Sequence, residues 1–286
     1  MTTGRSEVPL RRLPVAQRVS RALLPIYTAL VVMYLFLPIA VMIAFSFNDP
    51  RGRQNITWQG FTMENYLDVW SRPDITGPML SSLIVAFVAT GVATALGTLI
   101  GLALTRYEFR GQGPLHLLIY VPMATPEVIL GASLLAMWVT VGVQRGLETI
   151  IIAHVMFNIS FVVVTVRARI AGFNRSLEEA AMDLGADEWT TFRKITFPLI
   201  FPGIMAAALL AFALSIDDYV ITSFVAGQTV TFPLWVYGAS RFGVPPEVNV
   251  LGTLIFVVAF LGIIAQVLWS RWRRARQNAL IMESAR

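Results

Sequence analysis

Long apolar stretches alternate with polar segments along most of the chain, and six of them are long enough to form membrane-spanning helices. An α-helix needs about 20 mainly apolar residues to cross roughly 30 Å of hydrocarbon. The pattern therefore predicts an all-α membrane protein with six transmembrane helices. The expected spans cover residues 23–47, 79–105, 114–139, 147–166, 199–216 and 250–269, with long polar connections at 48–78 and 217–248.

The third expected span contains two features that a lipid-facing helix would not carry. Pro122 and Pro126 interrupt it, and Glu127 follows directly. Proline frees backbone carbonyls, and a carboxylate is costly in lipid, so Glu127 should face the bundle interior or a water-filled cavity. Two interpretations stay open. Glu127 either pairs with a neighbouring helix for structure alone, or it lines a path for a polar solute.

The composition supports a membrane location and limits the chemistry. Of the 286 residues, 56% are hydrophobic and 14% are charged, which is too apolar for a soluble domain of this size. The chain has no cysteine, which excludes disulfides and thiolate metal ligands. His116 and His154 lie far apart within apolar runs, so we expect hydrogen-bonded helix residues and no metal site.

The arginines and lysines predict the orientation. With six spans, the N-terminal arm (1–22), the 106–113 turn, the 167–197 loop and the C-terminal tail (271–286) lie on one side of the membrane. The other side holds only five of the 22 basic residues, namely Arg51, Arg53, Arg72, Arg145 and Arg241. The positive-inside rule therefore predicts a cytoplasmic arm, a transmembrane domain over 23–270 and a cytoplasmic tail. This distribution explains the net charge of +5 without a nucleic-acid partner.

The polar loop between the fourth and fifth spans has the pattern of two short helices. Ser176 is a plausible N-cap for a first helix ending at Gly185, where glycine can supply a positive φ. A second helix over 186–195 would place Trp189 and Phe192 on one side. These aromatic side chains either dock into a partner protein or fold back onto the lipid interface.

The spacing of this loop resembles the signature loop of the permeases of type I ABC importers. Glu179-Ala180-Ala181 is followed by Gly185, then Ile195, Phe197 and Pro198, and only Phe197 departs from the usual leucine. The resemblance implies a cytoplasmic coupling loop (176–197) whose helix lies in a groove of an ATPase subunit. Glu179 would anchor the loop, Gly185 would permit its bend, and Trp189 and Phe192 would fill the groove. The expected ATPase-coupling residues are Glu179, Ala180, Ala181, Gly185, Ala186, Trp189, Phe192, Ile195 and Pro198.

Acidic residues dominate the predicted outward side. Asp217, Asp218 and Tyr219 directly follow the fifth span, where two carboxylates and a ring could hold an alkylammonium group. The alternative is that they are ordinary interface residues. An acidic vestibule would attract a cationic solute. Its candidate residues are Asp49, Glu64, Asp68, Asp74, Glu148, Asp217, Asp218 and Glu247.

The segments 215–220, 222–227, 232–234 and 243–249 are similar to the second permease subunit of spermidine/putrescine importers. Pro122, Pro126, Glu127 and Gly131 in the third expected span are similar to the same subfamily. The resemblance implies a bacterial inner-membrane permease that pairs with a similar permease, two copies of an ATP-binding subunit and an extracytoplasmic solute-binding protein. The chain shows no Gly-rich loop ending in Gly-Lys-Ser/Thr, so we expect ATP and magnesium on the partner subunits and no cofactor here.

Two other classes remain as alternatives. A membrane-embedded enzyme would use Glu127, His116 and His154, but no pair of these residues has metal-ligand spacing. A secondary transporter would show internal repeats with two broken helices in matching positions, and only the third span is clearly broken. The same type of permease for a different small solute is the nearest alternative. We therefore expect no catalytic residues in this chain.

Overall fold

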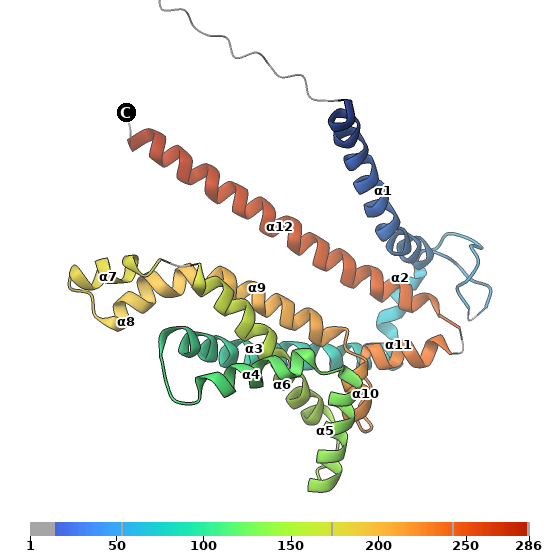
Figure 1. The fold of residues 1–286 in the computed structure, drawn as a ribbon. Helices are drawn as coiled ribbons and strands as arrows, with labels where there is room; N and C mark the ends of the chain where they lie inside the picture. Colours follow the sequence, from blue (N-terminus) through green and yellow to red (C-terminus); the bar gives the residue numbers. More distant parts are fainter. Residues whose placement is uncertain (1–14, 53, 173, 242, 285–286) are drawn as a thin grey trace, which may run out of the picture. The chain divides into compact units, whose positions relative to one another are not determined.

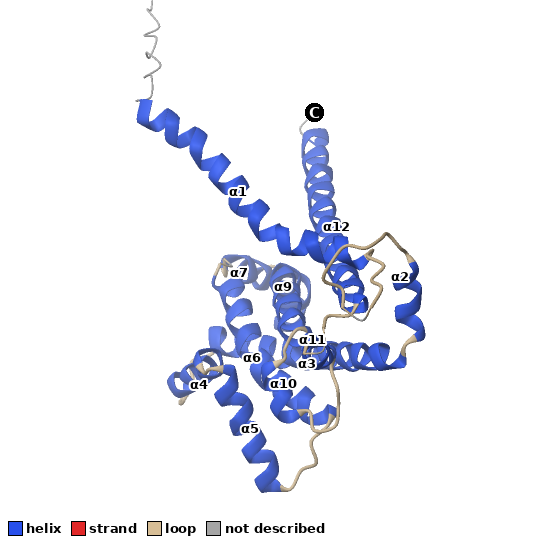
Figure 2. Ribbon diagram, turned by 90° about the vertical axis from the view of Figure 1, so that its right-hand side faces the viewer, coloured by secondary structure: helices blue, strands red, loops and turns tan. Residues whose placement is uncertain are grey.

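The computed structural model describes residues 15–52, 54–172, 174–241 and 243–284 (Figure 1). Within these ranges the ordered elements are helices, with no strand beyond a single antiparallel bridge between Asn48 and Phe61 (Figure 2). The chain divides into two compact units. One is Asp68–Phe242, and the other combines the described residues before and after it.

The unit formed by the two ends of the chain contains α1 (Val15–Ser46), most of α2 (Glu64–Asp68) and α12 (Pro246–Ser284). α1 packs against α12, and Gly252 allows the closest approach, because a Cβ there would lie 2.7 Å from Met42 Sδ. The loop after α1 is ordered by Asn48, which is fully buried. Its side-chain amide donates to Asn55 Oδ1 (2.6 Å) and to the Thr57 carbonyl (2.8 Å).

The larger unit is built around three long helices, α3 (Pro73–Arg106), α6 (Leu147–Ala171) and α9 (Phe197–Ile216), which pack against one another. Small residues bring them together: a Cβ at Gly97 of α3 would lie 2.6 Å from Val162 Cγ1 on α6. Such close contacts are the main source of helix association in lipid. The shorter elements are η1 (Val69–Ser71), α4 (Gln112–Ala124), α5 (Glu127–Val141), α7 (Ser176–Asp183), α8 (Glu188–Thr191), η2 (Phe192–Thr196), α10 (Val220–Val225) and α11 (Phe232–Ser240).

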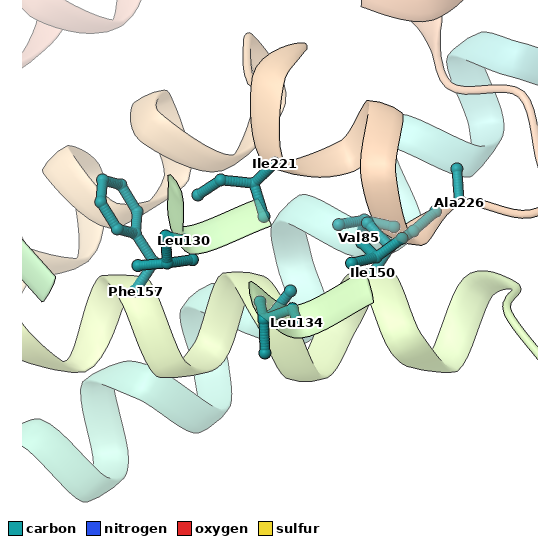
Figure 3. Packing of buried hydrophobic residues seen from close by; sticks show 9 residues of the cluster. Val85, Leu130, Leu134, Ile150, Phe157, Ile221 and Ala226 are labelled. Atoms are coloured by element: carbon teal, nitrogen blue, oxygen red, sulfur yellow. The ribbon is translucent and has the colours of Figure 1, made fainter. Parts of the chain in front are cut away.

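Two hydrophobic clusters form much of the core of this unit. In the first, side chains of α3, α5, α6 and α10 meet, among them Val85, Leu134, Ile150 and Ile221 (Figure 3). The second joins α3, α6 and α9 through alanines and β-branched residues. A short helix, α10, is therefore buried as deeply as the long ones.

The predicted break in the third span is confirmed at Pro126 but not at Pro122, which lies inside α4. α4 ends at Ala124, α5 begins at Glu127, and the two helices are bent by 107°. The cause is Pro126, since the residue before a proline is disfavoured in the helical conformation and Thr125 is extended (φ −79°, ψ 130°).

Four described helices are long and apolar enough to cross a membrane: Leu23–Ser46, Pro73–Arg106, Leu147–Ala171 and Glu188–Ile216. The bent pair α4–α5 adds a fifth candidate, and the apolar part of α12, Pro246–Gly262, is shorter. The expected 250–269 span lies inside the longer α12.

The expected polar connection at 217–248 is wrong in part, because it contains α10 and α11. Ile221, Thr222 and Val225 of α10 are buried. A helix of six residues carries too little periodicity to be recognised from the sequence.

Candidate functional site

The first helix of the loop after α6 is present as α7, but its predicted cap is wrong. Ser176 is the first helical residue, and its backbone N–H donates to the side chain of Asn174 (3.1 Å). The capping side chain therefore comes from two positions earlier. An asparagine there satisfies a free N–H of the first turn as the serine was expected to do.

Gly185 ends α7 with a φ of 88°, as predicted. Its N–H donates to the Met182 carbonyl (2.9 Å), and the Ala186 N–H donates to the Ala181 carbonyl (3.0 Å). Together these bonds form a Schellman motif, which satisfies the last carbonyls of a helix and requires a left-handed residue. Ala181 and Gly185, two positions of the signature pattern, therefore both belong to the backbone motif that ends α7.

The predicted second helix begins later than expected and does not end at 195. Asp187 caps α8 by accepting from the Thr190 N–H (3.1 Å), and this bond holds the pKa of Asp187 below its usual value. α8 then continues through η2, a π-helical turn in which Phe197 N–H bonds to the Phe192 carbonyl, directly into α9. The wider turn accommodates Pro198, which has no N–H to donate. The second loop helix and the fifth expected span are therefore one helix, Glu188–Ile216.

Trp189 and Phe192 lie on the same side of this helix, as predicted. Their rings stack with centroids 5.8 Å apart, and the row continues through Phe197 to Phe201. Trp189 is 66% exposed. Beside this pair, a cavity of about 830 Å³ is lined by residues of α3, α7, α8 and η2, including Glu179. The loop thus presents the rings of Trp189 and Phe192 next to this cavity.

A buried ion pair ties the loop to the body of the unit. Glu178 accepts hydrogen bonds from the Arg106 guanidinium at the end of α3 and from the Thr196 hydroxyl in η2. Its side chain is only 6% exposed, and that of Arg106 is 25% exposed. Burial by itself would raise the pKa of Glu178, but the bonds from Arg106 and Thr196 outweigh it and lower that pKa. Three elements therefore meet at one carboxylate.

Glu178 was not among the residues predicted for the site. The sequence shows Glu178 and Glu179 as equivalent members of a first helical turn, whereas the structure buries the first and exposes the second. The partner Arg106 lies 72 residues earlier in the chain. No local signal distinguishes the two glutamates.

On the other side of the unit, Asp218 lies two residues before the start of α10. Its carboxylate accepts from the Thr222 N–H (2.8 Å), the Thr222 hydroxyl (2.7 Å) and the Ile221 N–H (3.3 Å). His154 of α6 lies 3.3 Å away through Nε2. Asp217 next to it is exposed. The two adjacent carboxylates therefore have different surroundings.

Tyr219 packs against Tyr237 of α11, with ring centroids 4.5 Å apart. The guanidinium of Arg241 lies over the Tyr237 ring at 4.9 Å from its centroid and donates to the Tyr237 hydroxyl (3.2 Å). A cation already lies over this aromatic pair in the structure.

Glu127 and the two histidines complete the predicted residues. Glu127 is exposed in the first turn of α5, just after the bend. His154 is buried and hydrogen-bonded, as predicted, and His116 Nδ1 lies 3.4 Å from Arg167 Nη1. The structure does not bring Glu127, His116 and His154 together as one catalytic group.

Several helices long enough to cross a membrane, and a polar loop that exposes Trp189 stacked on Phe192, fit a component of a membrane transport system. The family described as binding-protein-dependent transport system inner membrane component matches residues 93–274. The chain belongs to this family, so it is a multi-pass inner-membrane transporter subunit and not an enzyme.

Named relatives narrow the family further. The chain is 39% identical over 239 residues to the spermidine/putrescine transport system permease protein PotC of Escherichia coli (strain K12), covering 83% of this chain and 90% of PotC. It is 37% identical over 252 residues to the putrescine transport system permease protein PotI of the same organism, covering 85% and 89%.

Solved structures share the fold. A bacterial ABC transporter that imports the acidic polysaccharide alginate matches with a TM-score of 0.63 at 16% identity, covering 91% of this chain and 98% of that chain. The MetNI methionine ABC transporter matches with a TM-score of 0.55 at 20% identity, covering 70% and 95%. These likenesses establish the ABC-importer permease fold.

Proposed function

We propose that this chain forms one half of the translocation path of an ATP-driven importer for a small cationic solute, a polyamine such as spermidine or putrescine. The observation that carries this proposal is the 39% identity to PotC over 90% of that protein, which reaches beyond the signature loop to the segment around Asp217. The proposed topology has six spans with both termini cytoplasmic, in which the bent α4–α5 pair and the apolar part of α12 each cross the membrane. The arm (1–22), the transmembrane permease domain (23–270) and the tail (271–286) are the proposed divisions.

The proposed partners are a second, similar permease, two copies of a cytoplasmic ATP-binding subunit, an extracytoplasmic solute-binding protein and the surrounding lipid. Nucleic acid is not among them. ATP and magnesium would bind to the ATPase subunits, so this chain would carry no cofactor. The exposed Trp189, stacked on Phe192 beside a cavity, is the surface that favours an ATPase groove over solvent.

The coupling mechanism follows from how the loop is built. Trp189 and Phe192 would dock into the ATPase groove and follow it as the nucleotide sites close. Because α8 continues into α9, this movement reaches the fifth span directly. The bonds of Glu178 to Arg106 and Thr196 would make α3 move with it. The cavity of the pore would thereby open alternately to each side.

Glu127, Asp217, Asp218 and Tyr219 are the proposed residues of the solute path. Asp217 and Glu127 are exposed on this chain, so both carboxylates are accessible to a cation. Glu127 stands at a helix break, where freed carbonyls add polar groups. The nearest alternative is the same machine with a different small solute.

Uptake competition tests the proposal. Cells with and without this subunit would take up labelled spermidine in the presence of unlabelled spermidine, putrescine or an unrelated amino acid. We expect uptake that depends on the subunit and is reduced by both polyamines but not by the amino acid. If the subunit instead supports uptake of the amino acid, and polyamines do not compete with it, the transported solute is not a polyamine. Uptake that continues without ATPase subunits would indicate a secondary transporter.

A further inference from the structure

His154 is the centre of a buried polar cluster that joins three helices of the larger unit. The imidazole projects from α6, and its Nδ1 lies 2.6 Å from the Ser215 hydroxyl at the end of α9. Its Nε2 lies 3.0 Å from the Thr222 hydroxyl of α10 and 3.3 Å from Asp218 Oδ2. The side chains of His154 and Asp218 are 4% and 9% exposed. Buried polar groups of this kind must satisfy one another, because water does not reach them.

The partners of His154 indicate which of its ring nitrogens carries a proton. The Thr222 hydroxyl donates its only proton to Asp218, so it can accept from His154 but cannot donate to it. His154 therefore carries a proton on Nε2, which faces both Thr222 and Asp218. In the neutral ring Nδ1 is then an acceptor, and the Ser215 hydroxyl donates to it. Every polar atom of the ring has a partner.

Asp218 is buried and bonded on both oxygens by the same arrangement. Its Oδ2 accepts from the Thr222 N–H and the Thr222 hydroxyl and lies 3.3 Å from His154 Nε2, while Oδ1 accepts a longer bond from the Ile221 N–H. The side chain is only 9% exposed, so a solute ammonium group would reach it only by disrupting these contacts and leaving a buried donor unsatisfied.

We propose that His154 is a positioning residue that commits Asp218 to anchoring α10, and that the exposed Asp217 is the carboxylate of this pair that contacts the cationic solute. The inference rests on the proposed function and assigns different roles to two adjacent acids that the sequence cannot distinguish. It also explains why α10 stays buried at the end of α9: its first turn is bonded to α6 through the imidazole.

Single cysteines test this division of roles directly, because the chain contains no cysteine of its own. The assembled importer carrying Asp217→Cys or Asp218→Cys would be treated with a cationic methanethiosulfonate, with and without spermidine. Thiol reactivity follows exposure, so we expect Asp218→Cys to react about tenfold more slowly than Asp217→Cys. Spermidine should protect only Asp217→Cys. Equal rates, or protection of Asp218→Cys, would overturn the proposal.

Substitutions of His154 separate positioning from general packing. In His154→Gln the amide nitrogen can take the place of Nε2 and still donate to Asp218, whereas the shorter His154→Asn cannot reach it. With Asp218 in place, His154→Asn should lower the melting temperature of the complex as Asp218→Asn does, and His154→Gln should not. His116→Asn is the matched control and should change nothing. If His154→Gln and His154→Asn have equal effects, His154 contributes only packing and does not position Asp218.

Charge-neutral variants give a second measurement that does not depend on labelling. Asp217→Asn should lower polyamine uptake about tenfold, the effect of losing roughly 1.4 kcal/mol of charge interaction, and leave the melting temperature of the complex unchanged. Asp218→Asn should lower the melting temperature. An unchanged uptake in Asp217→Asn would refute the assignment. Uptake by the unmodified complex tests the solute separately: if it moves no polyamine, the proposed function fails, while the labelling pattern still decides which carboxylate is accessible.

Discussion

Glu178→Gln is the most informative single change in the coupling loop. It keeps the shape of the side chain and an acceptor for Thr196, but it leaves the Arg106 guanidinium without its anion. Breaking a fully buried ion pair costs about 3–5 kcal/mol. Arg106 is 25% exposed and keeps part of its hydration, so we expect a smaller loss of about 1–2 kcal/mol. The loss should be visible as a lower melting temperature of the purified importer.

The pH dependence of this loss has a definite sign. The pKa of Glu178 is lower in the folded protein than in the unfolded chain, where it is about 4.3. The carboxylate therefore stabilises the fold fully above the unfolded pKa, and this contribution disappears as the pH falls through the folded pKa. The difference between the native protein and Glu178→Gln should be constant from about pH 8 to pH 5 and shrink below that range.

A double-mutant cycle completes the measurement. Arg106→Gln combined with Glu178→Gln should cost about 1–2 kcal/mol less than the sum of the single changes, because the pair is lost only once. Asp183→Asn removes an exposed carboxylate from the same helix and serves as the matched control. If Glu178→Gln melts like the native protein, or if the two changes are additive, the ion pair does not hold the loop.

Three further predictions concern positions where the backbone or a ring decides the outcome. Gly185→Val forces a β-branched residue to a φ of 88°, so it should uncouple ATP hydrolysis from uptake while membrane insertion is retained; unchanged coupling would contradict the role of the Schellman motif. Gly203→Ala places a Cβ 2.6 Å from Arg169 Cβ and should destabilise the α6–α9 contact by about 1–3 kcal/mol, whereas Gly91→Ala, with nothing within 4 Å, should not lower the melting temperature. Trp189→Ala should weaken co-purification of the ATPase without lowering the melting temperature, and undiminished co-purification would exclude docking through this ring.

The sequence predicts best those features that depend on neighbouring residues. The long apolar helices, the break before Glu127 and the left-handed Gly185 follow from hydrophobic length, proline geometry and glycine's freedom at positive φ. In each case the cause lies within a few residues of the effect.

Features that depend on distant partners were missed or placed wrongly. The second loop helix is predicted to end at 195, but it continues into α9 through a π-helical turn, which leaves no recognisable pattern in the sequence. The buried Glu178 is paired with Arg106, and the buried Asp218 lies against His154. These contacts join segments that are brought together only by the packing of α3, α6 and α9.

The uninterrupted helix from Glu188 to Ile216 has a consequence for how the chain tolerates change in length. Over 29 residues it extends roughly 43 Å and keeps the aromatic pair at one end in fixed angular phase with Asp217 at the other. One inserted residue anywhere along it would rotate the two ends by about 100° relative to each other. Insertions and deletions in this helix should therefore impair transport far more than those in the loop between α3 and α4, even at positions where the side chain can be replaced.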